Sequence, residues 1–357
     1  MAAERQPARV FDAIEGVPSP AETVGLIGQD RAEAELLDAY RSARMHHAWI
    51  LAGQKGVGKA TLAYRFARFV LAHPDPTAEP CRAAQDLALD PGDPVSTQVA
   101  AGGHPNLLVL QRRWNDETKR FTTGIPVEDV RRVLTFFGST AGHPGWRICL
   151  VDAADDLGPN AANALLKTLE EPPRRALFLL VSNTVAGLMP TIRSRCRTLA
   201  LADLSAEAVR AVIEKMPFGR DGDPKALDAA VSSAGGSVRP AIRFLTAGGQ
   251  EVGARYDRIL ADLTKAGDPP QADCHAVADL VARGGDDLFE VFLDLTRRWL
   301  TERVHREVGG TARAVVRWAL VWEKVDRSRA LGATLNLDRK ATVLGIVRAL
   351  SAAAKER

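Results

Sequence analysis

A glycine-rich loop that joins an apolar run to an amphipathic segment is the feature that most restricts how this chain can fold. The loop reads Gly53-Gln-Lys-Gly-Val-Gly-Lys59, and the run before it is His47-Ala-Trp-Ile-Leu51. The segment after the loop, residues 61–71, has its large apolar side chains at helical spacing. Strand, glycine loop and helix in this order are typical of a phosphate-binding loop, although a plain glycine-rich turn has the same composition.

In a phosphate-binding loop, backbone N–H groups surround the phosphate oxygens, the helix N-terminus adds partial positive charge, and a lysine reaches the outer phosphates. The sequence therefore predicts a nucleotide-phosphate site built from Gly53, Gly56, Gly58 and Lys59. The next position normally offers a hydroxyl to Mg²⁺, but here it is Ala60. Thr61 is kept as a candidate ligand, but it lies about 100° further round the helix and needs a rearrangement to substitute.

A second nucleotide motif shows a similar loss. The apolar run 148–151 ends at Asp152, whose carboxylate is expected to face a Mg²⁺ shell. A solvated aspartate at a strand end is the alternative. Ala153 replaces the glutamate that usually polarises the attacking water, and Asp155 and Asp156 are expected to point elsewhere. Independent ATP hydrolysis is therefore not expected, while ATP binding is left open and Mg²⁺ binding is disfavoured.

Apolar runs and helical segments alternate up to about residue 200, which predicts a parallel α/β sheet flanked by helices. The expected strands are 47–51, 107–110, 147–151 and 176–182, and the expected helices are 30–44, 61–71, 127–137 and 160–170. Six prolines make residues 73–106 an irregular insertion. Beyond residue 203 the strong patterns are helical.

Two further motifs lie beyond the loop in the sequence. Asn163-Ala-Leu-Leu-Lys-Thr-Leu-Glu-Glu-Pro-Pro173 reads as an amphipathic helix that a double proline ends, and Ser194-Arg195-Cys196 lies where the α/β region ends. Together with the loop, these motifs resemble bacterial clamp loaders of the AAA+ superfamily, and within them the delta-prime subunits of DNA polymerase III. The resemblance implies an α/β AAA+ domain (1–202, with the insertion 73–106), a small helical lid (203–247) and an all-α collar for oligomerisation (248–357).

The resemblance also implies roles for residues at matching positions. Arg195 would be a catalytic residue in trans, an arginine finger that reaches the ATP of a neighbouring subunit. From the local sequence alone, a surface salt bridge is the alternative. Asn183 matches the sensor-1 position, and Arg239 matches the sensor-2 arginine that approaches the γ-phosphate. Residues 27–29 match the segment that lines the adenine pocket.

A subunit of this kind assists ATP-dependent loading of a sliding clamp onto primed DNA during replication. The implied partners are the other subunits of a hetero-oligomeric ring, the sliding clamp, and primer–template DNA through the complex. Two alternatives stay open: a self-sufficient AAA+ ATPase that uses Thr61 and another acidic residue, and an architectural adaptor in which Arg195 forms a structural salt bridge. The basic cluster at residues 112–120 either contacts nucleic-acid phosphates or is a solvated loop.

Composition limits the remaining classes. The net charge is only +3, with 46% hydrophobic and 25% charged residues, which is typical of a soluble globular protein and does not demand nucleic acid. No run approaches the roughly 18 apolar residues of a membrane span, and the first residues do not resemble a signal peptide. The cysteines are dispersed, so we expect no disulfide, no zinc site and a reducing cytoplasm. They are Cys81, Cys149, Cys196 and Cys274.

Overall fold

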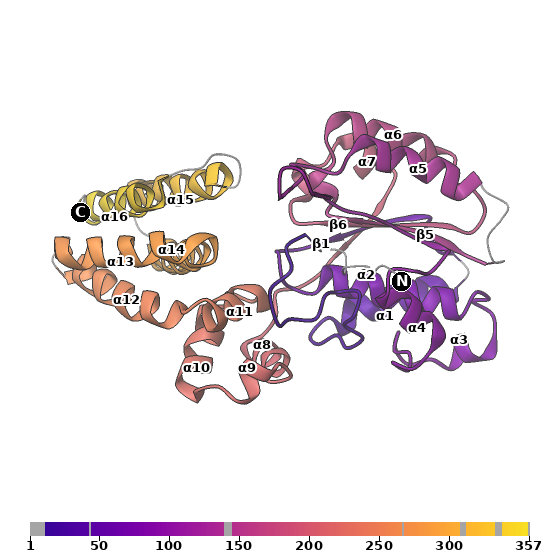
Figure 1. Cartoon of the computed structure of the whole chain (residues 1–357), viewed down its shortest axis with the longest axis horizontal. Coiled ribbons are helices and arrows are strands. Elements are labelled where there is room, and N and C mark those ends of the chain that lie inside the picture. The colour runs from indigo at the N-terminus through magenta and orange to yellow at the C-terminus, as the bar shows by residue number, and fades with distance from the viewer. Residues whose placement is uncertain are drawn as a thin grey trace. The chain divides into compact units, whose positions relative to one another are not determined.

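The structure of this chain, a computed structural model, describes residues 11–42, 44–138, 145–265, 268–307, 312–332 and 338–355. It divides into two units, residues 1–204 and 205–357. The first unit is an α/β domain and the second consists of helices (Figure 1). Residues 1–10, which the predicted first domain includes, lie outside the described residues.

A five-stranded parallel sheet forms the centre of the first unit, in the strand order β2-β5-β6-β1-β7. Its strands are β1 (Ala48–Ala52), β2 (Leu107–Leu110), β5 (Arg147–Asp152), β6 (Ala176–Ser182) and β7 (Arg197–Ala200). Strand β6 pairs with both β1 and β5, so that Ala52 lies opposite Ser182 and Asp152 lies opposite Val181. The carboxyl ends of these three strands therefore meet at one edge of the sheet.

Helices cover both faces of the sheet (Figure 1). One face packs against α1 (Asp30–Arg41) and α2 (Lys59–Ala72), and the other packs against α5 (Val127–Gly138), α6 (Pro159–Glu170) and α7 (Pro190–Arg193). Because side chains alternate along a strand, Trp49 and Leu51 of β1 join the first apolar cluster while Ile50 joins the second. Burial on both faces explains why the central strands read as continuous apolar runs.

The predicted fold class is confirmed, and each predicted strand and helix of the first unit occurs within a few residues of its expected bounds. Strand β7 was not predicted, because only Leu199 is buried among its four residues and an edge strand of this kind leaves no apolar run. A small antiparallel hairpin, β3 (Trp114–Asn115) with β4 (Arg120–Phe121), was also missed.

The insertion 73–106 is less irregular than its prolines suggested. It contains two short helices, α3 (Glu79–Ala83) and α4 (Pro94–Ala100), and each has a proline in its first turn. Proline suits that position because its fixed φ matches the helix and its missing N–H would be unpaired there anyway. Cys81 and Val99 then bury themselves in the cluster formed with α1 and α2.

A buried ion pair ties this insertion to the domain. The Arg65 guanidinium on α2 donates to the Glu33 carboxylate on α1 at 2.6 Å, and both side chains are at most one-tenth exposed. The same carboxylate oxygen accepts the backbone N–H of Leu87 at 2.8 Å. Glu33 is therefore shared between the helix layer and the insertion.

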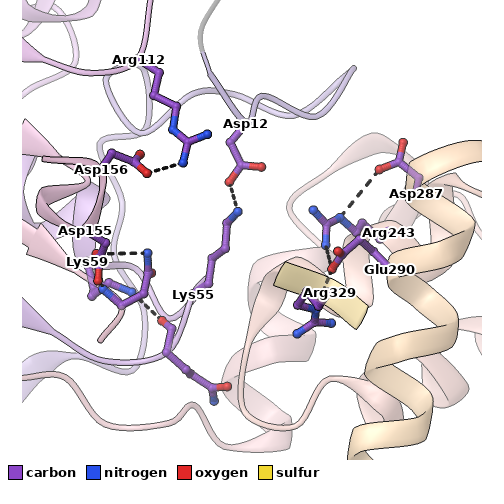
Figure 2. A network of polar contacts seen from close by, with 12 residues as sticks. Asp12, Lys55, Lys59, Arg112, Asp155, Asp156, Arg243, Asp287, Glu290 and Arg329 are labelled. Carbon is purple, nitrogen blue, oxygen red and sulfur yellow. Dashed lines mark hydrogen bonds and ion pairs between the residues drawn. The ribbon is translucent and has the colours of Figure 1, made fainter. Parts of the chain in front are cut away.

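The second unit is built from nine helices within its described residues. They are α8 (Ala206–Ile213), α9 (Pro217–Arg220), α10 (Pro224–Ser233), α11 (Val238–Thr246), α12 (Gly249–Lys265), α13 (Gln271–Arg283), α14 (Gly285–Glu307), α15 (Ala312–Gly332) and α16 (Arg339–Lys355). Arg243 of α11 and Arg329 of α15 both pair with Glu290 of α14, at 3.3 and 3.2 Å (Figure 2). This network connects the residues expected to form the lid with those expected to form the collar, and the boundary between the two stays a prediction.

None of the helices in the described parts of the chain combines the length and the apolar character that crossing a membrane requires.

The shared role of Glu33 leads to a stability prediction. We expect Glu33→Gln to lower the free energy of unfolding of the first unit by about 3 kcal/mol, because the buried Arg65 charge then keeps the more distant and exposed Asp86, at 3.7 Å, as its counter-ion. Hydrogen exchange of the β1 and β5 amides measures this for the first unit alone.

The matched control is Glu35→Gln on the same helix. Glu35 pairs with Arg197 at 2.8 Å, but the two side chains are 35% and 53% exposed, so its loss should cost less than about 1 kcal/mol. Equal losses for the two variants would contradict the role given to Glu33.

Candidate functional site

The glycine loop between β1 and α2 has the backbone that its sequence predicts. Gly58, the residue before α2, has φ +102°, a region that side chains with a Cβ rarely adopt. At Gly53 a Cβ would lie 3.1 Å from the carbonyl oxygen of Leu201. Both glycines are therefore required by this path of the chain, which carries it from the end of a buried strand into the first turn of a helix.

Side-chain amides hold the loop in place. Gln29 is buried and donates to the carbonyl oxygens of Val57 at 3.0 Å and of Ala202 at 2.8 Å. Gln54 of the loop donates to the Asp203 carboxylate at 2.7 Å. The segment 27–29, expected to line an adenine pocket, thus also fixes the loop to the chain that comes after β7.

Lys59 starts α2 and is buried. Its ammonium donates to the carbonyl oxygens of Gly53 at 2.8 Å and Gln54 at 2.6 Å, within its own loop (Figure 2). Burial lowers the pKa of Lys59 to about 8, against the nearby carboxylates of Asp155 and Asp152, which favour the charged form. At neutral pH the ammonium is mostly charged, and two carbonyl oxygens of its own loop accept from it.

Asp152 ends β5 at the same edge of the sheet and is half-buried. Burial raises its pKa to about 6, although the Lys59 charge opposes this shift. Ala153 comes next in the chain and offers no group to polarise a water molecule. The strand-end carboxylate is in the predicted position, and its role toward Mg²⁺ stays a prediction.

Asp155 was expected to point away from the predicted Mg²⁺ position, and its hydrogen bonds show where its carboxylate lies. It turns back to the end of β6, where its carboxylate accepts the backbone N–H groups of Asn183 at 2.8 Å and Thr184 at 2.9 Å. The Ser182 hydroxyl donates to it at 3.2 Å. Asp155 therefore connects the ends of β5 and β6 and faces the Asn183 side chain at 3.5 Å.

The residues present are suited to holding a nucleotide phosphate, but they lack groups that hydrolysis of ATP normally requires. The loop backbone and Lys59 supply the parts that hold phosphate oxygens. Ala60 supplies no hydroxyl for Mg²⁺, and Thr61 lies half-buried one position further along α2. Bound Mg-ATP would bring phosphoanhydride chemistry, but this chain offers it neither the usual hydroxyl ligand nor a glutamate. The nucleotide-binding roles of these residues stay predictions.

Arg195 lies just beyond α7 and is about one-third exposed. Its guanidinium pairs with the Glu170 carboxylate at 2.7 Å and donates to the Thr191 carbonyl oxygen at 2.9 Å. The neighbouring Cys196 packs against the apolar cluster beneath α6, and burial raises the pKa of its thiol to about 12. The triplet therefore consists of a neutral, inward-facing thiol that anchors an arginine at the surface.

The remaining predicted site residues, Arg239 and the basic cluster at residues 112–120, do not lie in the glycine loop. Arg239 lies in the first turn of α11 in the second unit, and its sensor-2 role stays a prediction. In the basic cluster, Arg112 pairs with Asp156 and Arg113 pairs with Asp129. Two of its cations are therefore already neutralised inside the domain, which weakens the case for direct phosphate contacts there.

Metal ligands do not gather in the described residues, where no group of three or more His, Cys, Asp or Glu side chains could hold an ion. Cys81 is buried, and burial raises the pKa of its thiol. A zinc-binding thiolate is disfavoured at that position.

Comparison with known proteins identifies a family model and several relatives that are similar to this chain. A family model described as "DNA polymerase III, delta subunit" matches residues 28–205. The chain is similar to DNA polymerase III subunit delta' of Pseudomonas aeruginosa, with 36% identity over 43% of this chain and 42% of that protein. It is also similar to DNA polymerase III subunit gamma of Buchnera aphidicola, with 30% identity over 62% of this chain and 56% of that protein. The chain thus spans about half the length of the curated relatives it matches.

Among solved structures, a DNA polymerase III gamma subunit-related protein of Thermotoga maritima matches 90% of this chain and 99% of its own, with 17% identity. The TM-score is 0.42, which is too low for this likeness to support any conclusion about function.

Neutralising Asp152, the last residue of β5, and neutralising Asp155, which lies just beyond it, should change the stability of the first unit in opposite directions. The folded-state pKa of Asp152 is raised, so ionisation destabilises the fold as the pH rises from about 4 to about 6. We expect Asp152→Asn to stabilise the first unit by about 1–3 kcal/mol at pH 7.5, with a gain that shrinks toward pH 4.

Asp155→Asn is the matched variant. It weakens the acceptor for Asn183 and Thr184, so we expect it to destabilise the unit by about 1–2 kcal/mol. Hydrogen exchange of the β5 and β6 amides between pH 4.5 and 7.5 measures both effects. Stabilisation by both variants, or a gain for Asp152→Asn that does not depend on pH, would refute the assignment.

Proposed function

This chain belongs to the clamp-loader family of AAA+ proteins, and we propose that within it the chain acts as a delta-prime type of subunit that presents Arg195 to the ATP of a neighbouring subunit. The observation that carries the proposal is a contrast within one domain. The chain's own loop lacks the Mg²⁺ hydroxyl at Ala60 and the catalytic glutamate at Ala153. The arginine that would serve another subunit's site is kept and lies at the surface.

The way Arg195 is held supports this role. Ile192 and Cys196 fix the segment against the apolar cluster on the α6 side of the sheet, so the backbone beneath the arginine is anchored. The ion pair with Glu170 is exposed, with side chains 35% and 49% accessible, and pairs of this kind contribute about 0–1 kcal/mol. The guanidinium can therefore exchange this partner for a phosphate at small cost.

An arginine suits this task for chemical reasons. Its guanidinium is planar, permanently charged and able to donate two parallel hydrogen bonds to phosphate oxygens. In phosphoryl transfer it stabilises the charge that develops on the transferred group, and a finger of this kind contributes roughly 10³–10⁵ in rate in GTPases. In this proposal the chain supplies that charge, and the neighbour supplies the metal and the attacking water.

The same proposal implies the partners. The chain joins a hetero-oligomeric ring whose ATP-driven closure opens a sliding clamp and loads it onto primed DNA, as part of a cytoplasmic replication assembly. Helix α15 exposes Val316 at 55% and Leu320 at 62%, which lie one turn apart on the same face, while Trp322 lies on another face beside Arg297. Exposed apolar groups on one helix fit a surface that another subunit covers.

An architectural adaptor is the second candidate, and one observation favours it. Arg195 already has a partner in its own chain, Glu170, so the arginine has a structural explanation that needs no neighbour. The two candidates differ in what the loss of Arg195 does to the ATPase activity of the assembled ring.

The test is the DNA-stimulated ATPase activity of a reconstituted clamp loader that carries Arg195→Ala. We expect the neighbouring site to lose turnover by about 10³-fold or more, with the ring still assembled. Arg193→Ala is the matched control, because Arg193 lies two residues earlier on the exposed surface and should leave turnover unchanged.

The isolated Arg195→Ala chain should lose less than about 1 kcal/mol of stability, since the ion pair it breaks is exposed. A stable variant that assembles and keeps full ATPase activity would favour the adaptor. Substantial turnover by the isolated wild-type chain, abolished by Lys59→Ala, would instead favour the self-sufficient ATPase.

A further inference from the structure

The segment before α1 contacts the glycine loop directly. The Asp12 carboxylate forms an ion pair with the ammonium of Lys55, which lies between Gly53 and Gly56 in the loop (Figure 2). Asp12 has φ +67°, a conformation that aspartate tolerates better than most residues. Its carboxylate is thus held by the chain's own backbone against a cation of the phosphate-binding loop.

Phe11 gives this segment a second anchor. The Arg112 guanidinium lies 4.5 Å from the centroid of the Phe11 ring, and the Phe121 ring meets it edge-on at 5.3 Å. Arg112 also pairs with Asp156, which lies just beyond β5 (Figure 2). Phe11 is therefore attached to Arg112 and the β3–β4 hairpin, and through Arg112 to Asp156, while Asp12 is attached to the loop after β1.

Both lysines of the loop therefore have partners within the chain. Lys55 pairs with Asp12, and Lys59 donates to two loop carbonyl oxygens. Asp12 also adds to the negative potential at Asp152, whose pKa is raised mainly by burial and further by the Asp12 charge. An incoming phosphate would have to displace these contacts and approach a carboxylate, and like charges at short range repel.

We propose that Phe11 and Asp12 form an intramolecular strap that holds nucleotide phosphate off this chain's own loop, with the Asp12 carboxylate occupying Lys55. The strap concerns only the chain's own loop. It is independent of whether Arg195 acts on a neighbour.

The proposal is tested by the binding of a fluorescent ATP analogue, mant-ATP, to the full isolated chain, with Mg²⁺ and with EDTA. The Lys55 and Asp12 side chains are 50% and 25% exposed, so solvent screens their pairing. We therefore expect Asp12→Asn to bind about fivefold more tightly than wild type, a change of about 1 kcal/mol. Phe11→Ala should also raise the affinity for mant-ATP, because it releases the second anchor while it keeps the Asp12 charge. Lys59→Ala in the Asp12→Asn background should remove the gain in affinity, which would show that the added binding occurs at the glycine loop.

Glu15→Gln is the matched control, since it removes one negative charge from an exposed position of the same segment. It should leave the affinity unchanged. Equal affinities for wild type and Asp12→Asn would overturn the proposal, and so would the absence of binding in both, because the loop would then be closed by something other than the strap. A gain for Glu15→Gln as large as that for Asp12→Asn would also overturn it, as a general charge effect. No other subunit is present in this measurement, so its outcome leaves the arginine-finger proposal untouched.

Discussion

The parallel pairing of β6 with both β1 and β5 is the constraint on which the rest of the first unit depends. It brings three strand ends to one edge, so that the glycine loop, Asp152 and Asp155 lie together although about 100 residues separate the first from the others. The Asp155 carboxylate then fastens the ends of β5 and β6 through backbone N–H groups of Asn183 and Thr184. The shell of a nucleotide site is therefore preserved by hydrogen bonds of the fold itself.

At this edge of the sheet, the charged side chains have partners within the chain. Lys59 donates to loop carbonyls, Lys55 pairs with Asp12, and Asp155 accepts from the end of β6. Arg195 differs from them, because its backbone is anchored by buried neighbours while its charged end is exposed. The proposed arginine-finger role rests on this contrast between Arg195 and the charged groups at the sheet edge.

The first unit was predictable because its central strands are buried on both faces and its helices are amphipathic, which leaves strong patterns in the sequence. The short helices of the insertion were missed because prolines were interpreted as breaks, whereas Pro80 and Pro94 lie in the first turns of helices. The orientation of Asp155 and the contact between Asp12 and Lys55 could not be predicted, since each joins residues whose proximity only the tertiary fold creates. Sequence motifs identified the positions of the site, and the structure revealed how their charges are balanced.

The most direct test of the account is a structure of the reconstituted clamp loader trapped with a transition-state analogue, ADP with aluminium fluoride. The account predicts that the Arg195 guanidinium has left Glu170 and lies about 3 Å from an oxygen or fluorine ligand of the analogue in a neighbouring subunit. An Arg195 that still pairs with Glu170, while the neighbour holds the analogue, would contradict the central claim and leave the chain as an adaptor.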